Sequence, residues 1–163
     1  MLRLVILRHA HSEPAGAGGD RKRRLSSRGH EQCEDVLNHM RENGIVPEVV
    51  VCSTAARTRE TWQRIAAAAP DARLDLHDAL YSGGPDAYED AIAAANADGT
   101  VLVVGHNPTC AALALSCRGA RDLDPMLAQG RYPTGSLLVA EMHERARVAT
   151  HFFTPPRRDA AGD

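Results

Sequence analysis

Three short runs of apolar residues constrain the fold of this chain more than any other feature. They cover Leu2–Leu7, Val49–Cys52 and Thr100–Val104, and each is nearly continuous rather than alternating. A strand buried on both faces of a parallel sheet has this pattern, because helices cover both of its sides. Long stretches separate the three runs, so together they predict an α/β fold with a largely parallel sheet.

Helix-forming stretches separate these runs, and weaker strands follow them. The predicted helices run from Ser26 or Ser27 to about Asn43, over Ala55–Ala69, over Asp86–Ala97 and onward from Pro108. The further strands predicted are Arg73–Leu76 and a hairpin of Leu137–Met142 and Arg147–Phe153. Because the hairpin adds an antiparallel edge, we expect a three-layer α/β/α sandwich with a mostly parallel mixed sheet.

Length and charge narrow the class of protein further. At 163 residues the chain fits one domain. We place it at residues 1–154, followed by a disordered tail at 155–163. The formal charge of −2 argues against a general nucleic-acid or membrane-surface binder. With neither a leader-like segment nor an apolar run of membrane length, a cytoplasmic protein is expected. The oligomeric state is left open.

No metal or other cofactor is expected. The four cysteines lack zinc-ligand spacing and occur in apolar or helical contexts, as buried reduced thiols do: Cys33, Cys52, Cys110 and Cys117. A metal site of His9, His11 and His106 is a weak alternative, because no Asp or Glu accompanies them at ligand spacing.

Each of the three strong strands is followed by a polar cluster. The clusters are Arg8-His9-Ala10-His11-Ser12, Ser53 to Thr61, and Gly105-His106-Asn107-Pro108. In open α/β sheets, ligands bind outside the carboxyl ends of the strands. We therefore expect Arg8, His9, Arg57 and His106 to meet in one crevice.

These four side chains suit the transfer of a phosphoryl group. The guanidinium groups of Arg8 and Arg57 match phosphoryl oxygens, and a neutral His9 could attack phosphorus in line. The arginine charges would keep His9 unprotonated, and a backbone carbonyl could fix its tautomer.

His106 and Ser12 are expected to assist in binding the phosphoryl group. Asn107 and Pro108 predict a helix start just after His106, where an anion is favoured, so His106 would bind the oxyanion, in one version as imidazolium. The Ser12 hydroxyl is a candidate phosphate donor, with an ordinary loop serine as the alternative.

The motifs resemble those of the histidine phosphatase superfamily, which also contains the phosphoglycerate mutases. Leu7-Arg8-His9-Ala10 resembles the nucleophile motif, and Gly105-His106-Asn107-Pro108 the second-histidine motif. Ser53-x-Ala-x-Arg57-x-x-x-Thr61 is similar to the second-arginine motif. Leu25-Ser26-x-x-Gly29 and Pro133-Thr134-Gly135 match secondary signatures, so the resemblance covers nearly the whole chain.

Within the superfamily, the short length and the motif forms look most like the SixA-type phosphohistidine phosphatases. Thr54 and Glu60 depart from the usual proline and glutamine. Many members carry a glutamate proton donor in a Leu-x-Glu segment, and Leu76-His77-Asp78 falls in that register. The resemblance thus makes Asp78 the candidate acid, with Glu13 and Asp86 as substitutes and a plain surface aspartate as the alternative.

The resemblance implies a metal-independent phosphatase that forms a phosphohistidine intermediate. Its substrate would be phosphohistidine on a protein or, as the alternative, a small phosphate ester. A mutase is a weaker reading, and a non-catalytic phosphate-binding module is a remote one. The basic run Arg21–Arg24 is either a solvated loop or a contact for an acidic or phosphorylated partner.

Overall fold

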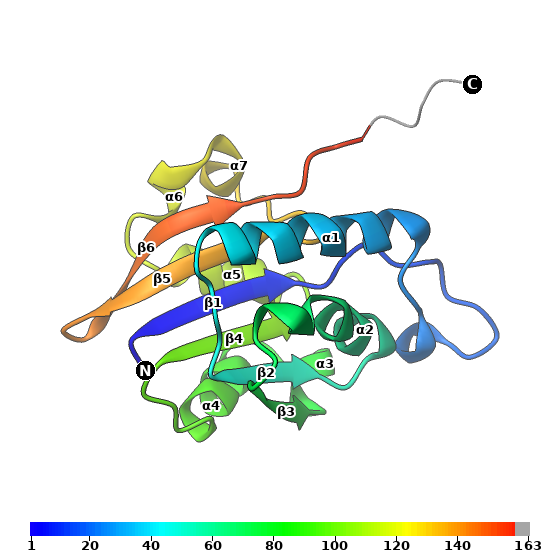
Figure 1. The fold of residues 1–163 in the computed structure, drawn as a ribbon, viewed down its shortest axis with the longest axis horizontal. Coiled ribbons are helices and arrows are strands. Elements are labelled where there is room, and N and C mark those ends of the chain that lie inside the picture. Colours follow the sequence, from blue (N-terminus) through cyan, green and yellow to red (C-terminus); the bar gives the residue numbers. More distant parts are fainter. Residues whose placement is uncertain (159–163) are drawn as a thin grey trace.

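The computed structural model describes residues 1–158, and the remaining five residues lie outside it. Its centre is one six-stranded sheet with the strand order β3-β2-β4-β1-β5-β6 (Figure 1). The strands are β1 (Arg3–Arg8), β2 (Val49–Ser53), β3 (Arg73–His77), β4 (Thr100–Gly105), β5 (Leu137–His143) and β6 (Ala146–Phe153). The first four run parallel, and the β5–β6 hairpin is antiparallel. The predicted mixed sheet with its closing hairpin is confirmed.

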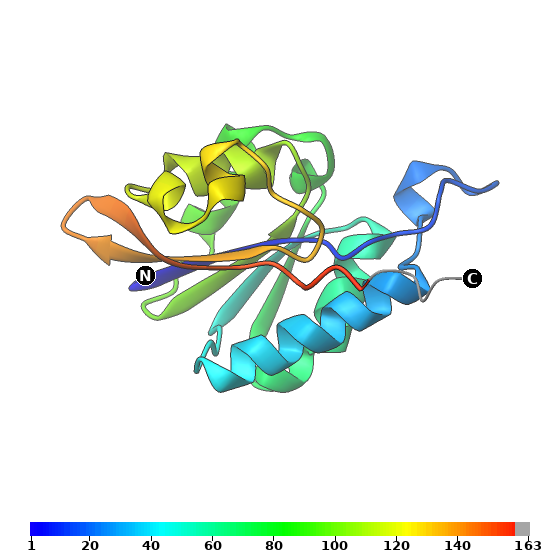
Figure 2. The ribbon, with the colours of Figure 1, turned by 90° about the horizontal axis from the view of Figure 1, so that it is seen from above.

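Helices cover both faces of this sheet, as the three-layer prediction requires. The helices are α1 (Ser27–Glu42), α2 (Ala56–Ile65), α3 (Ala79–Ser82), α4 (Pro85–Ala94), α5 (Thr109–Ser116), α6 (Ala120–Leu123) and α7 (Pro125–Ala128). In addition, 3-10 turns η1 and η2 cover Asp20–Lys22 and Ala66–Ala68. Figure 2 shows α1 and α2 on one face and α4 to α7 on the other.

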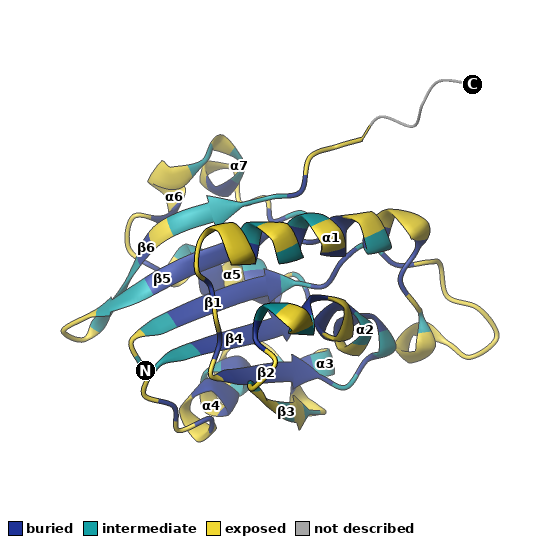
Figure 3. Ribbon diagram, viewed as in Figure 1, coloured by how far each residue is buried: buried dark blue, intermediate teal, exposed yellow. Residues whose placement is uncertain are grey.

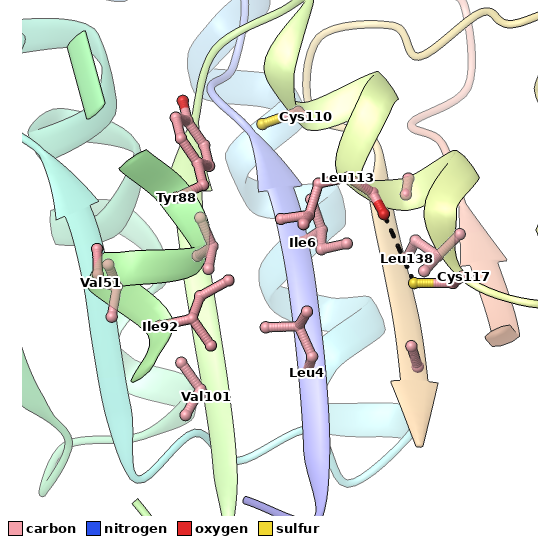
Figure 4. Packing of buried hydrophobic residues seen from close by; sticks show 14 of the residues in the cluster. Leu4, Ile6, Val51, Tyr88, Ile92, Val101, Cys110, Leu113, Cys117 and Leu138 are labelled. Atoms are coloured by element: carbon pink, nitrogen blue, oxygen red, sulfur yellow. Dashed lines mark hydrogen bonds between the residues drawn. The ribbon is translucent and has the colours of Figure 1, made fainter. Parts of the chain in front are cut away.

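Alternating side chains of strands β1, β2, β4 and β5 enter two separate cores. Leu4 and Ile6 of β1 pack with α4 and α5 in the first core, which Figure 4 shows. Val5 and Leu7 pack with α1 and α2 in the second. Burying each such side chain contributes roughly 1.5–3 kcal/mol. The two cores explain why the strand sequences are continuously apolar, and why the central strands are the most buried part of Figure 3.

The start of α1 explains one of the secondary signatures. Ser26 caps the helix by accepting a hydrogen bond from the Gly29 amide at 3.1 Å. A Cβ atom on Gly29 would lie 2.0 Å from the carbonyl oxygen of His11. The glycine therefore lets α1 pack directly on the segment that follows β1.

Several predicted helix limits need correction. The helix expected to reach Ala69 ends at Ile65 and continues as the 3-10 turn η2, because Pro70 cannot prolong an α-helix. The helix expected over residues 86–97 is α4, which starts at Pro85 and ends at Ala94. The short helices α3, α6 and α7 were not predicted, since four residues carry little periodic signal.

The C-terminal residues that can be described lie along the domain. Pro155 is buried, and Arg158 pairs with Asp35 at 2.8 Å. Residues 159–163, which the predicted disordered tail includes, lie outside the described residues, and the domain limit at residue 154 stays a prediction. None of the described helices is long and apolar enough to span a membrane.

Candidate active site

A cavity of about 360 Å³ opens at the carboxyl ends of β1 and β4. It contains the four side chains that the sequence analysis placed in one crevice, and Ser12 as well. The lining residues are Arg8, His9, His11, Ser12, Arg23, Arg57, His106, Asn107 and Thr134. Asp78 is not among them.

His9 is buried and held in one tautomer. Its Nδ1 lies 2.8 Å from the carbonyl oxygen of Ala10. Because a carbonyl can only accept, Nδ1 carries the proton and Nε2 keeps its lone pair. Burial lowers the pKa of His9 to about 3, and His106, Arg57 and Arg8 add to this effect. The ring is therefore neutral at physiological pH, with an unprotonated Nε2.

Arg57 contacts that nitrogen directly. Its Nε–H donates to Nε2 of His9 at 3.3 Å. The other end of the guanidinium donates to Asp20, through Nη1 to the carbonyl at 3.0 Å and through Nη2 to the carboxylate at 3.2 Å. These hydrogen bonds to His9 and Asp20 fix the orientation of the Arg57 guanidinium.

The first turn of α2 is tied to the segment after β1 through Thr61. The Thr61 hydroxyl donates to the carbonyl of Arg57 at 2.7 Å and accepts from the Ala10 amide at 3.1 Å. This link keeps the helix that carries Arg57 in register with the chain that carries His9.

Arg8 also lines the cavity. Its Nη1 donates to the carbonyl of Tyr132 at 3.0 Å, and Nε is buried without a hydrogen-bond partner among the described residues. Burial lowers the pKa of Arg8, and the positive charge of Arg57 adds to this. Two guanidinium groups in one cavity repel each other, so an anion between them would be stabilised.

His106 is held from two sides. The Tyr88 hydroxyl accepts from its backbone amide at 2.9 Å, and Nε2 lies 2.8 Å from the hydroxyl oxygen of Ser53. Burial and, to a smaller extent, the charge of Arg57 together lower the pKa of His106 to about 4. This pKa makes the ring neutral at physiological pH, and an imidazolium form of His106 beside a bound oxyanion stays a prediction.

The helix start predicted from Asn107 and Pro108 needs correction, because Asn107 does not cap the helix. Helix α5 begins at Thr109, with Pro108 at its N-cap and no side-chain cap. Asn107 lies too early to cap it, and its Nδ2 donates to the carbonyl of Tyr132 at 2.9 Å instead. The His106 carbonyl still accepts from the Cys110 amide at 2.8 Å, so the ring lies one turn before the helix.

Asp20 and Tyr81 join the site without having been predicted. The Tyr81 hydroxyl donates to the Asp20 carboxylate at 2.6 Å, and its ring lies edge-on to His106 at 5.8 Å. The hydrogen bond from Tyr81, followed by those from Arg23 and Arg57, lowers the pKa of Asp20 to about 2. Asp20 lies in a Gly-rich loop with no periodic pattern, so nothing in its local sequence pointed to Arg57.

Asp78 lies outside the cavity, in contact with Arg21 and Thr54. Its side chain is 79% exposed. The hydrogen bond from Thr54 and the charge of Arg21 lower its pKa, so it is a carboxylate at neutral pH. This geometry does not favour a proton donor, and the role stays a prediction. Neither Glu13 nor Asp86 lines the cavity.

The lining chemistry suits an anion and includes an unprotonated imidazole nitrogen. The lining side chains include three guanidinium groups, the imidazoles of His9, His11 and His106, and the hydroxyls of Ser12 and Thr134. Among the described residues, no carboxylate lines the cavity. In residues 1–158 no group of three or more His, Cys, Asp or Glu side chains is placed to hold a metal ion.

Comparison with known proteins agrees with this geometry. A family model described as "Histidine phosphatase superfamily (branch 1)" matches residues 4–81. An uncharacterized protein of Mycobacterium tuberculosis is 31% identical over 153 residues, which cover 90% of this chain and 89% of that protein. An uncharacterized protein of Mycobacterium leprae is 35% identical over 147 residues, covering 85% and 89%.

Two solved structures are similar over nearly their whole length. A putative phosphohistidine phosphatase SixA from Agrobacterium tumefaciens has a TM-score of 0.82 and 28% identity, covering 94% of this chain and 98% of that one. A second putative phosphohistidine phosphatase SixA, from Nakamurella multipartitia, has a TM-score of 0.76 and 31% identity, covering 94% and 96%.

Proposed function

Since this chain belongs to the histidine phosphatase superfamily and is a phosphatase, we propose that it removes phosphate from phosphohistidine on a protein. In this proposal His9 is the nucleophile, no metal takes part, and the enzyme passes through its own phosphohistidine. The observation that carries it is the state of His9. Its proton is held on Nδ1 by Ala10, and its unprotonated Nε2 faces the cavity that Arg8 and Arg57 line.

In the first step the phosphoryl group enters between Arg8 and Arg57. The Nε–H of Arg57 turns from Nε2 of His9 to a phosphoryl oxygen, which frees the lone pair of His9. Nε2 attacks phosphorus, and the bond from phosphorus to the leaving group breaks. The donors of Arg8, Arg57, His106 and Ser12 stabilise the charge on the transferring group.

In the second step water attacks the phosphorus of phosphorylated His9. The bond between phosphorus and Nε2 breaks, and its electron pair returns to Nε2. With Nδ1–H still donating to Ala10, the ring leaves as neutral imidazole rather than as an anion. The water oxygen becomes part of inorganic phosphate, and the proton of the water stays on the phosphate or passes to solvent.

The absence of a carboxylate from the lining that the described residues form supports a phosphoramidate substrate. An alkoxide leaves poorly without a proton donor. The imidazole of phosphohistidine needs less help, because a proton on its distal nitrogen lets it leave as a neutral ring. The similar structures from Agrobacterium tumefaciens and Nakamurella multipartitia are both putative phosphohistidine phosphatases, which supports the same substrate class.

The test measures phosphate release from a phosphohistidine-bearing protein and from para-nitrophenyl phosphate, with EDTA present. We expect a clear preference for phosphohistidine, loss of both activities in His9→Ala, and an acid-labile, alkali-stable phosphoenzyme in rapid-quench samples. Equal or better hydrolysis of the ester would move the assignment to small phosphate esters. Release of phosphate by His9→Ala at near the wild-type rate would refute the nucleophile. No release by the wild-type protein from either substrate would favour a binding module.

A further inference from the structure

A second cavity is lined by residues from two segments that also line the catalytic cavity. Its volume is about 410 Å³, and we call it the basic cavity; Lys22, Arg24, Ala56, Arg59, Glu60 and Gln63 line it. The segment Lys22–Arg24 contributes to both cavities, with Arg23 in the catalytic one and its two neighbours in the other. In Figure 1 the blue segment near residue 20 lies beside α2, whose first turn contributes Ala56 to the basic cavity and Arg57 to the catalytic one.

The wall formed by α2 is one face of that helix. Ala56, Arg59, Glu60 and Gln63 are spaced i, i+3, i+4 and i+7, so they lie along a single stripe. Arg57, one residue along from this stripe, points instead into the catalytic cavity. The small side chain of Ala56 leaves room at the end of the stripe that is nearest to Arg57.

The charges of the basic cavity are unbalanced. Among the described residues, Glu60 is the one carboxylate that lines it. The Glu60 side chain is 13% exposed and accepts a hydrogen bond from the Leu25 amide at 3.0 Å, so its charge is already partly compensated. Arg24 approaches Glu60 at 3.5 Å. The side chains of Lys22 and Arg59 are exposed and, within residues 1–158, make no hydrogen bond or ion pair. Two cations are thus free to meet negative charge brought by a partner.

We propose that the basic cavity binds acidic side chains that flank the phosphohistidine of a protein substrate. This inference rests on the proposed function and adds to it a preference for an acidic sequence around the phosphorylated residue. A substrate whose phosphoryl group reaches His9 lies against Arg23 and Arg57, and its neighbouring residues are then in reach of Lys22 and Arg59 on the same two segments. Complementary charge at such a rim favours encounter and correct register.

A protein segment fits this space better than a second phosphate group does. Phosphate sites place several donors around one point, as Arg8 and Arg57 do in the catalytic cavity. Here the free cations stand on two separate elements, and the space is larger than the catalytic cavity. Carboxylates on neighbouring residues of a chain can reach both elements at once.

The experiment compares two phosphohistidine peptides that differ only in their flanks, one acidic and one with the matching amides. For the wild-type protein we expect kcat/KM to be about tenfold higher with the acidic peptide, through KM, and the preference to shrink as salt is added. The double variant Lys22→Ala/Arg59→Ala should lose the preference. The charge-matched control is Arg41→Ala/Arg145→Ala, two exposed arginines at the end of α1 and in the β5–β6 turn, and it should keep the preference.

Activity on para-nitrophenyl phosphate separates this inference from the proposed function. The ester has no flanking residues, so we expect the Lys22/Arg59 variant to hydrolyse it at the wild-type rate. If the wild type hydrolyses both peptides equally and the variant changes neither, the basic cavity does not bind acidic flanks, while the phosphatase assignment stands. A preference for a small bisphosphate over its monophosphate, lost in the same variant, would instead make the cavity a second phosphate site. Failure of the wild type on every substrate would refute the proposed function itself.

Discussion

The Nε–H of Arg57 donates to Nε2 of His9 at 3.3 Å, so the proposed nucleophile and its principal cation are in contact before substrate binds. The guanidinium occupies the lone pair of His9 without protonating it, because a guanidinium does not give up its proton at neutral pH. It also places the cation where a phosphoryl group must arrive. The remaining donors of Arg57 are anchored on Asp20, which limits how far the guanidinium can turn.

Replacing Arg57 should therefore be costly. In Arg57→Ala we expect kcat/KM for para-nitrophenyl phosphate to fall about 10³-fold, as with other arginines that stabilise a transferring phosphoryl group. Arg57→Lys should recover about tenfold at most, because an ammonium lacks the planar fork that bonds both the backbone carbonyl and the carboxylate of Asp20. The control is Arg59→Ala, two residues along on the exposed face of α2, which should keep wild-type activity on this ester. An active Arg57→Ala protein would contradict the proposed role.

Asp20 acts, in our interpretation, by orienting Arg57. In Asp20→Asn we expect kcat/KM for para-nitrophenyl phosphate to fall about tenfold, because a charge-assisted hydrogen bond becomes a neutral one and the guanidinium is less well oriented. The Asp20 side chain is 47% exposed, so the melting temperature should change little. Higher activity in Asp20→Asn would show that Asp20 competes with the phosphoryl group instead of positioning its partner.

Asp78 tests whether the proton donor suggested by the family resemblance operates. With its carboxylate on Arg21 and Thr54 and its pKa lowered by them, Asp78→Asn should keep phosphate release from both phosphohistidine and an alkyl ester such as glycerol phosphate within about threefold of wild type. The alkyl ester is used because its alkoxide needs a proton to leave, and a loss of about 100-fold or more on it alone would restore Asp78 as the acid.

The buried histidines should make the protein sensitive to acid. The pKa values of His9 and His106 are lowered to about 3 and about 4, whereas unfolded histidines titrate near 6.5. Between these values the unfolded chain binds more protons than the folded one, so the free energy of unfolding falls as the pH falls. We expect the melting temperature to drop between pH 7 and about pH 4.5, and to drop less in His9→Ala, which removes one of the two groups. Parallel pH profiles for the two proteins would contradict the burial-driven shift of His9.

Gly105 ends β4 where no side chain fits. A Cβ atom there would lie 2.4 Å from the hydroxyl oxygen of Tyr88, the group that accepts from the His106 amide. We expect Gly105→Ala to lower the free energy of unfolding by about 1–3 kcal/mol, by forcing Tyr88 out of its buried position. Gly84→Ala is the matched control, because a Cβ atom at that residue would have no described atom within 4 Å and its φ of −87° is open to alanine. Denaturant unfolding of the two variants measures the difference.

The sequence by itself determined the sheet and the identity of four side chains at one of its edges. Leu2–Leu7, Val49–Cys52 and Thr100–Val104 are apolar on both sides of the strand, which only a sheet covered on both faces accommodates. Parallel strands end at the same edge, so the polar residues that follow them must meet there. Arg8, His9, Arg57 and His106 could therefore be brought together from local patterns alone.

Only the tertiary structure decided how these side chains are held and charged. The partner of Arg57 is Asp20, from a loop without periodicity, and the partner of Asp20 is Tyr81, from a helix of four residues. The neutral state of His106 follows from burial, and burial is set by every element that packs around the ring. Local sequence patterns show which side chains of one segment pack into the core. They do not record which distant segment completes a hydrogen bond or removes water, and those two effects set the geometry and the protonation of this site.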